Sequence, residues 1–116
     1  MRKGKRLVLG VLALALPAGC SRAGAGSPEG ATLFATYCSR CHGLEGKGGL
    51  STDAGSAPRN FRDPSFHKGR TDADLRATIE GGRGTVMPPF RGLLQPAQLD
   101  ALVQHLRSLD PGRSSR

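Results

Sequence analysis

Aromatic residues are scarce in this chain of 116 residues, which has no tryptophan, one tyrosine and four phenylalanines. A domain of this length buries only a modest apolar surface, and large aromatic side chains are one means of enlarging a small core. The composition therefore excludes a large aromatic core that stabilises the fold by itself. We expect the fold to need a second source of stabilisation.

Long apolar segments are also absent. The longest apolar run is residues 7–16, ten residues in length, whereas a transmembrane helix needs about 20. Four basic residues precede the run within residues 1–6, and Pro17-Ala18-Gly19 follows it. This order of basic, apolar and small residues is typical of a secretory signal peptide. We therefore expect residues 1–19 to be a signal peptide and the protein to be exported.

Cysteine is equally scarce: there are three, and two of them lie in one short motif. The third, Cys20, directly follows Ala18-Gly19 in a context that resembles the bacterial lipobox, although Pro17 stands where that motif usually has leucine. We expect Cys20 to carry two acyl chains, with residues 20–27 as the lipidated N-terminus and a short tether. The alternative is an ordinary signal peptide cut near residues 23–25, which would discard Cys20.

Charge of one sign does not dominate once the signal peptide is set aside. The formal net charge of the whole chain is +8, but residues 1–19 hold four of its basic residues and no acidic one. The rest has 13 basic and 9 acidic residues, a net charge of +4. This modest excess does not favour nucleic-acid binding. It can steer the protein towards acidic redox partners, or it is simply a solvated surface.

The stretch that organises the chain is residues 38–42, Cys38-Ser39-Arg40-Cys41-His42, which has the spacing of a c-type haem attachment site. Two thiols three positions apart on one helical turn can each form a thioether to a vinyl group of the same porphyrin. His42 then lies under the ring, where a neutral imidazole nitrogen can ligate the iron. A covalently bound porphyrin is also a second source of stabilisation, so we expect the haem-free protein to fold poorly.

Two other kinds of site use cysteine pairs. A zinc site would combine Cys38, Cys41 and His42 with His67, but structural zinc sites seldom use an adjacent cysteine and histidine. A thiol redox motif would need a preceding strand within a βαβ pattern, which the sequence lacks. The sequence favours haem attachment over both.

Met87 is the only methionine besides the first residue, and Pro88-Pro89 follows it. The prolines hold the backbone extended, which would fix the direction of the Met87 side chain. We expect Met87 to be the sixth iron ligand. The alternatives are a flexible core filler, or a state in which His67 displaces it; otherwise His67 is expected to be an exposed loop residue. A thioether ligand favours ferrous iron and closes the iron to oxygen and peroxide, so we expect outer-sphere electron transfer and no enzyme activity.

Capping and periodicity signals predict three main helices and no strands, so the predicted fold class is all-α. The first helix begins after Ser27, has Pro28 at its first position and runs into the cysteine motif. The second spans residues 72–80, with a capping box that starts at Thr71. The last opens at Pro96. Its apolar stripe consists of Leu99, Leu102, Val103, Leu106 and Leu109.

Residues 43–70 are rich in glycine, serine, aspartate and proline and show no helical or strand period. A stretch of this length without a period is uncommon in a small domain unless it has a function. We expect it to wrap the edge of the haem, with Phe61 and Phe66 as apolar contacts. A ligating imidazole usually donates its second N–H to a carbonyl or carboxylate. The rigid Ala57-Pro58 segment is expected to supply the acceptor for His42.

Taken together, these features resemble a class I c-type cytochrome, similar to bacterial single-haem cytochromes of the c551, c6 and cbb3-subunit kind. The matching segments are Gly30-x-x-x-Phe34-x-x-x-Cys38-x-x-Cys41-His42-Gly43, Ala57-Pro58, Leu75-x-x-x-Ile79-x-x-Gly82, Met87-Pro88 and Ala101-Leu102-Val103-x-His105-Leu106-Arg107-Ser108-Leu109. The resemblance implies a cytochrome c fold, in which the first and last helices cross at the glycine and aromatic positions. It also implies His/Met ligation and a Pro58 carbonyl that accepts from His42. His105 stands where the last helix often has tyrosine, and we expect it to pack at a helix contact.

Residues 28–111 are accordingly expected to form the cytochrome c domain, and residues 112–116 a C-terminal tail. The expected function is to shuttle single electrons between exported donor and acceptor proteins, as a monomer anchored by lipid on the periplasmic side of a bacterial membrane. One alternative is a fixed haem subunit of a membrane oxidoreductase or oxidase. Another is a haem-based sensor or a peroxidase-type enzyme with a labile sixth ligand.

Overall fold

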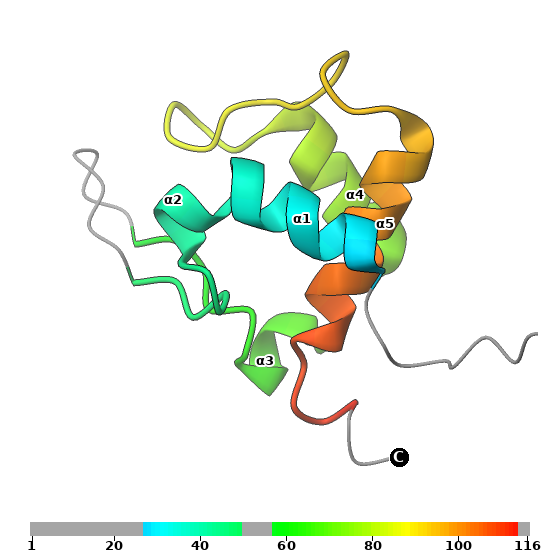
Figure 1. Cartoon of the computed structure of the whole chain (residues 1–116). Helices are drawn as coiled ribbons and strands as arrows, with labels where there is room; N and C mark the ends of the chain where they lie inside the picture. Colours follow the sequence, from blue (N-terminus) through cyan, green and yellow to red (C-terminus); the bar gives the residue numbers. More distant parts are fainter. Residues whose placement is uncertain (1–26, 50–56, 114–116) are drawn as a thin grey trace, which may run out of the picture.

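The computed structural model describes residues 27–49 and 57–113. Its helices are α1 (Pro28–Tyr37), α2 (Ser39–His42), α3 (Pro64–His67), α4 (Asp72–Gly81) and α5 (Pro96–Ser108) (Figure 1). Extended pairing within these residues is confined to two isolated bridges, which confirms the all-α fold class. No helix in the described ranges is long and apolar enough to cross a membrane. The predicted signal peptide, Cys20 and most of the predicted tether and tail lie outside the described residues.

The start of α1 agrees with the predicted cap. The Ser27 hydroxyl oxygen accepts a hydrogen bond from the Gly30 N–H (3.4 Å). Pro28 occupies the first helical position, where no N–H is needed, and Glu29 lies near the positive end of the helix dipole. The chain turns at Cys38 and continues directly as α2. The cysteine motif therefore begins at the residue that ends α1, where the Cys38 N–H donates to the Phe34 carbonyl.

The predicted capping box of α4 is present as well. The Thr71 hydroxyl accepts from the Asp74 N–H (3.1 Å), and the Asp74 carboxylate accepts from the Thr71 N–H (2.8 Å). The helix ends at Gly81, one residue later than predicted. It stops there because Gly82 has φ +70°, a left-handed conformation that glycine adopts without strain.

The helices α1 and α5 cross with their backbones in close contact (Figure 1). A Cβ atom added to Gly30 would lie 2.1 Å from the carbonyl oxygen of Ala101 and 3.0 Å from the Cβ of His105. Beside this contact the Phe34 ring packs 5.1 Å from the His105 ring, centroid to centroid. The prediction that His105 packs at a helix contact is therefore confirmed, and Gly30 is the residue that lets the helices approach.

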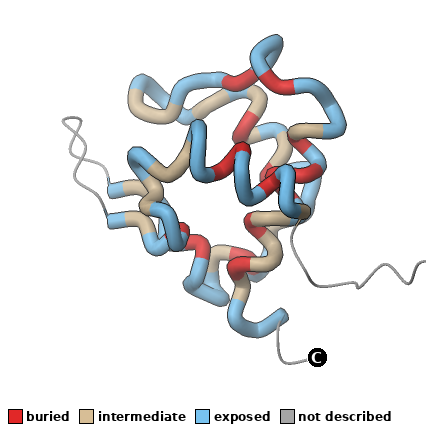
Figure 2. The backbone as a smooth tube through the Cα atoms, viewed as in Figure 1, coloured by how far each residue is buried: buried red, intermediate tan, exposed pale blue. Residues whose placement is uncertain are grey.

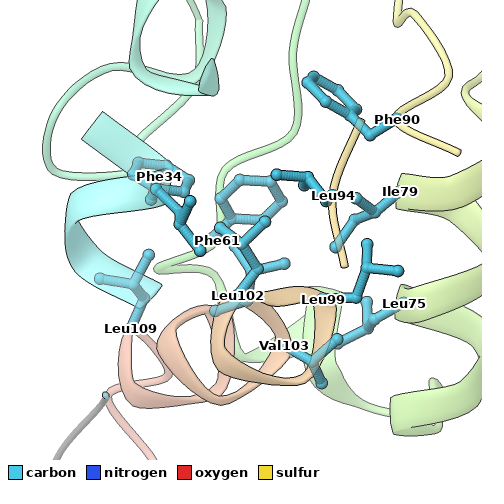
Figure 3. Close-up of a cluster of buried hydrophobic side chains, with 12 residues drawn as sticks. Phe34, Phe61, Leu75, Ile79, Phe90, Leu94, Leu99, Leu102, Val103 and Leu109 are labelled. Atoms are coloured by element: carbon cyan, nitrogen blue, oxygen red, sulfur yellow. The ribbon is translucent and has the colours of Figure 1, made fainter. Parts of the chain in front are cut away.

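The hydrophobic core lies where α1, α4 and α5 meet, and the buried residues gather on the inner faces of these helices (Figure 2). All five residues of the predicted α5 stripe are buried. Phe34 and Leu102 are the most deeply buried large side chains, each 1% exposed. Figure 3 shows this cluster, in which Phe61 joins the helices from the long loop. The core is thus built mainly by the helices, and the long loop contributes Phe61 to it.

The long loop contains a short helix that the sequence analysis missed. The carboxylate of Asp63 caps α3 by accepting from the Ser65 N–H (2.9 Å), and Pro64 takes the first helical position. His67, the last residue of α3, is buried, so its prediction as an exposed residue is wrong. Its Nε2–H donates to the Phe61 carbonyl (2.7 Å). The loop is therefore locally ordered around a buried histidine.

Arg107, near the end of α5, holds this loop against the helices. Its Nε donates to the Asp72 carboxylate (2.7 Å) and its Nη2 to the Arg70 carbonyl (2.6 Å). Its Nη1 lies 3.4 Å from His67 Nδ1, which accepts because Nε2 carries the proton. The Arg107 side chain is 13% exposed, whereas that of Asp72 is 71% exposed. Arg107 is therefore the more buried partner of this ion pair, and Asp72 is the exposed one.

We predict that Arg107→Ala lowers the free energy of unfolding of the haem-loaded protein by about 2–3 kcal/mol, because partly buried acceptors on Arg70 and His67 lose a charged donor. Thermal and denaturant unfolding followed by circular dichroism measure this loss. The matched change Asp72→Ala removes only the exposed partner and should cost less than about 1 kcal/mol. Equal losses for the two variants would contradict the assignment of the stability to the buried contacts.

Candidate haem site

One cavity of about 700 Å³ lies between the helices and the long loop, within the size range of small-molecule and cofactor sites. Its walls come from α1, α2, α4 and α5 together with the segments 57–66 and 83–90. The cavity brings together all seven described residues that were predicted to contact a haem. These are Cys38, Cys41, His42, Pro58, Phe61, Phe66 and Met87. Residues 49 positions apart in the sequence thus meet at one site.

His42 presents one ring nitrogen for ligation because the other is already bonded. Its Nδ1 lies 3.2 Å from the Arg59 carbonyl oxygen, and since a carbonyl can only accept, Nδ1 carries the proton. Nε2 then has a free lone pair, the form that binds iron. The ring also stacks on Phe61, with centroids 4.5 Å apart. Burial lowers the pKa of His42, against the opposing effect of the Arg59 hydrogen bond, so the neutral imidazole is favoured.

The acceptor for His42 differs from the predicted one by a residue. The Pro58 carbonyl was expected to accept, but it accepts instead from the Gly49 N–H (3.3 Å). The Arg59 carbonyl, one peptide further along, faces the imidazole. Pro58 keeps its place on the cavity wall.

Cys41 lies on the single turn of α2, and Cys38 is the N-cap residue directly before it. The N–H groups of Cys41 and His42 both donate to the Cys38 carbonyl (3.2 and 2.9 Å), which holds the motif in a helical turn. Burial, and secondarily the nearby Cys41, raise the pKa of the Cys38 thiol to about 11. A thiol redox site needs a lowered pKa, so this environment does not favour that alternative. No cluster of three or more metal-binding side chains occurs within the described ranges, and His67 is turned away towards Phe61.

Met87 projects from a turn that is anchored at both ends. Arg83 and Met87 exchange two backbone hydrogen bonds (2.9 and 3.2 Å), and the Phe90 N–H then donates to the Ile79 carbonyl at the end of α4 (3.0 Å). A Cβ on Gly82 would lie 2.5 Å from the Met87 carbonyl oxygen, so the turn packs directly on that glycine. The Met87 side chain is half-buried against the core and lines the cavity.

The lining of the cavity fits a haem. An imidazole and a thioether on its walls are the donors of a His/Met haem site. Three arginines also reach the wall and suit the two carboxylates of the porphyrin; they are Arg59, Arg70 and Arg83. The apolar part of the wall suits the flat face of the macrocycle. It includes Phe34, Phe61, Phe66, Ile79, Leu102 and Leu106. No local sequence pattern marks these arginines as cavity residues, because only the fold shows which of the many basic residues face inwards.

The chain is similar in sequence to a known protein family and to several of its members. Residues 26–106 match the family model described as cytochrome C oxidase, cbb3-type, subunit III. The cbb3-type cytochrome c oxidase subunit FixP of Bradyrhizobium sp. (strain ORS 278) is 34% identical over 93 residues, which cover 80% of this chain and 31% of that protein. Cytochrome c-L of Methylorubrum extorquens is 37% identical over 88 residues, covering 72% of this chain and 40% of that protein. The chain thus spans about a third of the length of these curated relatives.

The chain is also similar to a solved structure. The KustC0563 c-type cytochrome superposes with a TM-score of 0.59 and 29% sequence identity. The superposition covers 70% of this chain and 96% of that one, so the likeness extends over a whole cytochrome domain. With the Cys38 to His42 motif on the wall of a haem-sized cavity, the chain belongs to the family of cytochrome c oxidase, cbb3-type, subunit III, and it is a class I c-type cytochrome with a covalent haem c.

Proposed function

We propose that this domain transfers single electrons through one haem c, with Cys38 and Cys41 as the thioether residues and His42 and Met87 as the two axial ligands. The observation that carries the proposal is that the imidazole, the thioether and both thiols line one cavity. The haem supplies a one-electron couple between ferrous and ferric iron. Family membership supports electron transfer as the general function.

The residues of this chain have definite tasks in that proposal. The Arg59 carbonyl and the Phe61 ring hold the His42 imidazole in one tautomer and one orientation. The anchored turn of residues 83–87 holds Met87 on the wall of the same cavity. Two protein ligands leave no coordination position for a substrate. The domain then acts as a carrier and not as a catalyst, and a sensor or peroxidase function is disfavoured.

The identity of the relatives favours one cellular setting for this domain. Several are subunits of cbb3-type oxidases, in which this chain would correspond to a part of a longer subunit. We therefore place the electron carrier in a membrane oxidase complex as a fixed haem subunit, ahead of the freely shuttling carrier that the sequence alone suggested. Export by residues 1–19 and lipid attachment at Cys20 belong to the same proposal. They would keep residues 28–111 at the periplasmic membrane surface, in reach of donor and acceptor proteins.

Fractionation of the native host tests this setting. Membranes are solubilised in mild detergent and separated by native electrophoresis, and haem staining locates the protein. A fixed subunit runs with a larger haem-containing complex in stoichiometric amount, whereas a shuttle runs alone as a monomer. Intact mass spectrometry of the same material reports haem, cleavage site and acyl chains together. A mature N-terminus downstream of Cys20 would contradict the lipid anchor but not electron transfer.

A further inference from the structure

The segments on either side of residues 50–56 are joined by backbone hydrogen bonds next to the proximal histidine. The Phe61 N–H donates to the Gly46 carbonyl (2.7 Å) and the Gly49 N–H donates to the Pro58 carbonyl (3.3 Å). Between these two bonds, the Gly48 N–H donates to the carbonyl of His42 itself (2.8 Å). The turn at residues 46–49 is therefore connected both to His42 and to the segment that carries its hydrogen-bond acceptor.

Gly48 makes the closest contact between the two segments. A Cβ atom added to it would lie 2.4 Å from the Pro58 carbonyl oxygen and 2.6 Å from the Arg59 carbonyl oxygen. Real Cβ atoms do not approach backbone oxygens so closely, and here neither partner is a flexible side chain. The neighbouring Gly49 has a similar left-handed backbone, φ +75° against +66°, yet a Cβ on Gly49 would meet nothing within 4 Å. Of these two glycines, Gly48 is the one whose Cβ position lies against the carbonyl that accepts from His42.

From this contact we infer that Gly48 is a positioning residue, which sets the strength of the hydrogen bond from His42 Nδ1–H to the Arg59 carbonyl and thereby tunes the potential of the haem iron. The inference rests on the proposed role of His42 as a ligand. The hydrogen bond is already 3.2 Å long, at the upper end of the normal range of about 2.7–3.2 Å. A side chain at position 48 would overlap both the Pro58 and the Arg59 carbonyls. We expect the segment that carries them to shift, and a small shift of the Arg59 carbonyl is enough to weaken the bond.

The consequence for the iron follows from ligand basicity. A carbonyl that accepts from Nδ1–H makes the imidazole a stronger electron donor through Nε2, and this stabilises the ferric state. Loss of the hydrogen bond removes that donation, so the ferrous state gains and the midpoint potential rises. A residue that acts only on the stability of the turn would leave the potential where it is.

The experiment compares Gly48→Ala with Gly49→Ala in the haem-loaded full chain. Both changes force a side chain into a left-handed backbone, but only the first places a methyl group against the Arg59 carbonyl. We expect Gly48→Ala to raise the midpoint potential and Gly49→Ala to leave it unchanged. In proton NMR of the ferrous protein, the His42 Nδ1–H of Gly48→Ala should exchange with solvent about tenfold faster, as expected for the loss of one hydrogen bond. Thermal unfolding of both variants measures the shared cost of backbone strain.

The results of this comparison either support or contradict the role of Gly48. If Gly48→Ala matches Gly49→Ala in potential and in exchange, the positioning role is wrong. If Gly48→Ala yields too little loaded protein, the same change is made in a Pro58→Gly background, where segment 57–59 can yield to the methyl group, and is compared with Pro58→Gly alone. A higher potential in the double variant supports the role and an equal one overturns it. An unaltered protein without haem, or without a methionine-to-iron absorption band, contradicts the proposed ligation instead.

Discussion

Replacement of Met87 by alanine is expected to abolish the methionine-to-iron absorption band of the ferric protein, lower its midpoint potential and open the ferrous protein to rapid carbon monoxide binding. The thioether is the proposed ligand that favours the ferrous state, and axial ligands span about 0.8 V of haem potentials. Removal of that ligand should therefore change the potential more than any other single substitution outside the haem motif. Optical spectra and a redox titration of the purified, loaded protein measure these effects.

The fold should survive this substitution, which separates a ligand role from a packing role. Met87 is only half-buried, and the turn that carries it is held by backbone hydrogen bonds at Arg83 and Phe90. The control Met87→His restores a sixth ligand of the other common kind: it should lower the potential but block carbon monoxide. A ferric band that persists in Met87→Ala would mean that Met87 is a core filler and that its assignment as a ligand is wrong.

The second large effect is expected at the helix crossing. A methyl group at Gly30 would lie 2.1 Å from the Ala101 carbonyl oxygen, so Gly30→Ala must push α1 away from α5. Overpacking of this kind costs about 3 kcal/mol or more, against a gain of about 1 kcal/mol from the better helix propensity of alanine. We expect a net loss of at least about 2 kcal/mol, equivalent to roughly 10 °C in the melting temperature of a domain this size. Thermal unfolding of the loaded protein measures it.

The chain offers a matched control with the opposite expected sign. Gly81 is also a helical glycine, at the end of α4, but a Cβ on it would meet nothing within 4 Å. Gly81→Ala should therefore leave the melting temperature unchanged or raise it slightly, because only helix propensity acts there. A melting temperature for Gly30→Ala equal to that for Gly81→Ala would show that the helices can separate without cost, which contradicts the account of the crossing.

The parts of the fold that the sequence predicted correctly depend on local signals. The start of α1 follows from Ser27-Pro28 and that of α4 from a capping box at Thr71, each readable within a few residues. The α5 stripe follows from the helical period alone. The haem motif is likewise a local pattern at residues 38–42. Such features need no knowledge of how distant segments meet.

Two of the errors concern contacts between distant segments, and the third concerns a short local helix. His67 was expected to be exposed, but it is buried, and Arg107, 40 residues later, contacts its ring. The choice between Pro58 and Arg59 as acceptor depends on how segment 57–62 sits on the turn at residues 46–49, which no local pattern specifies. The short helix α3 had an Asp63-Pro64 capping signal, but four residues are too few for a hydrophobic period.

The most direct test of the central claim is the absorption spectrum of the purified, unaltered protein, recorded in the ferric form and then in the ferrous form under carbon monoxide at neutral pH. If His42 and Met87 both ligate the iron, the ferric spectrum contains the methionine-to-iron band and the ferrous spectrum does not change rapidly when carbon monoxide is added. A ferric spectrum without that band, together with rapid carbon monoxide binding, would contradict the account of a closed electron carrier and favour a sensor or peroxidase.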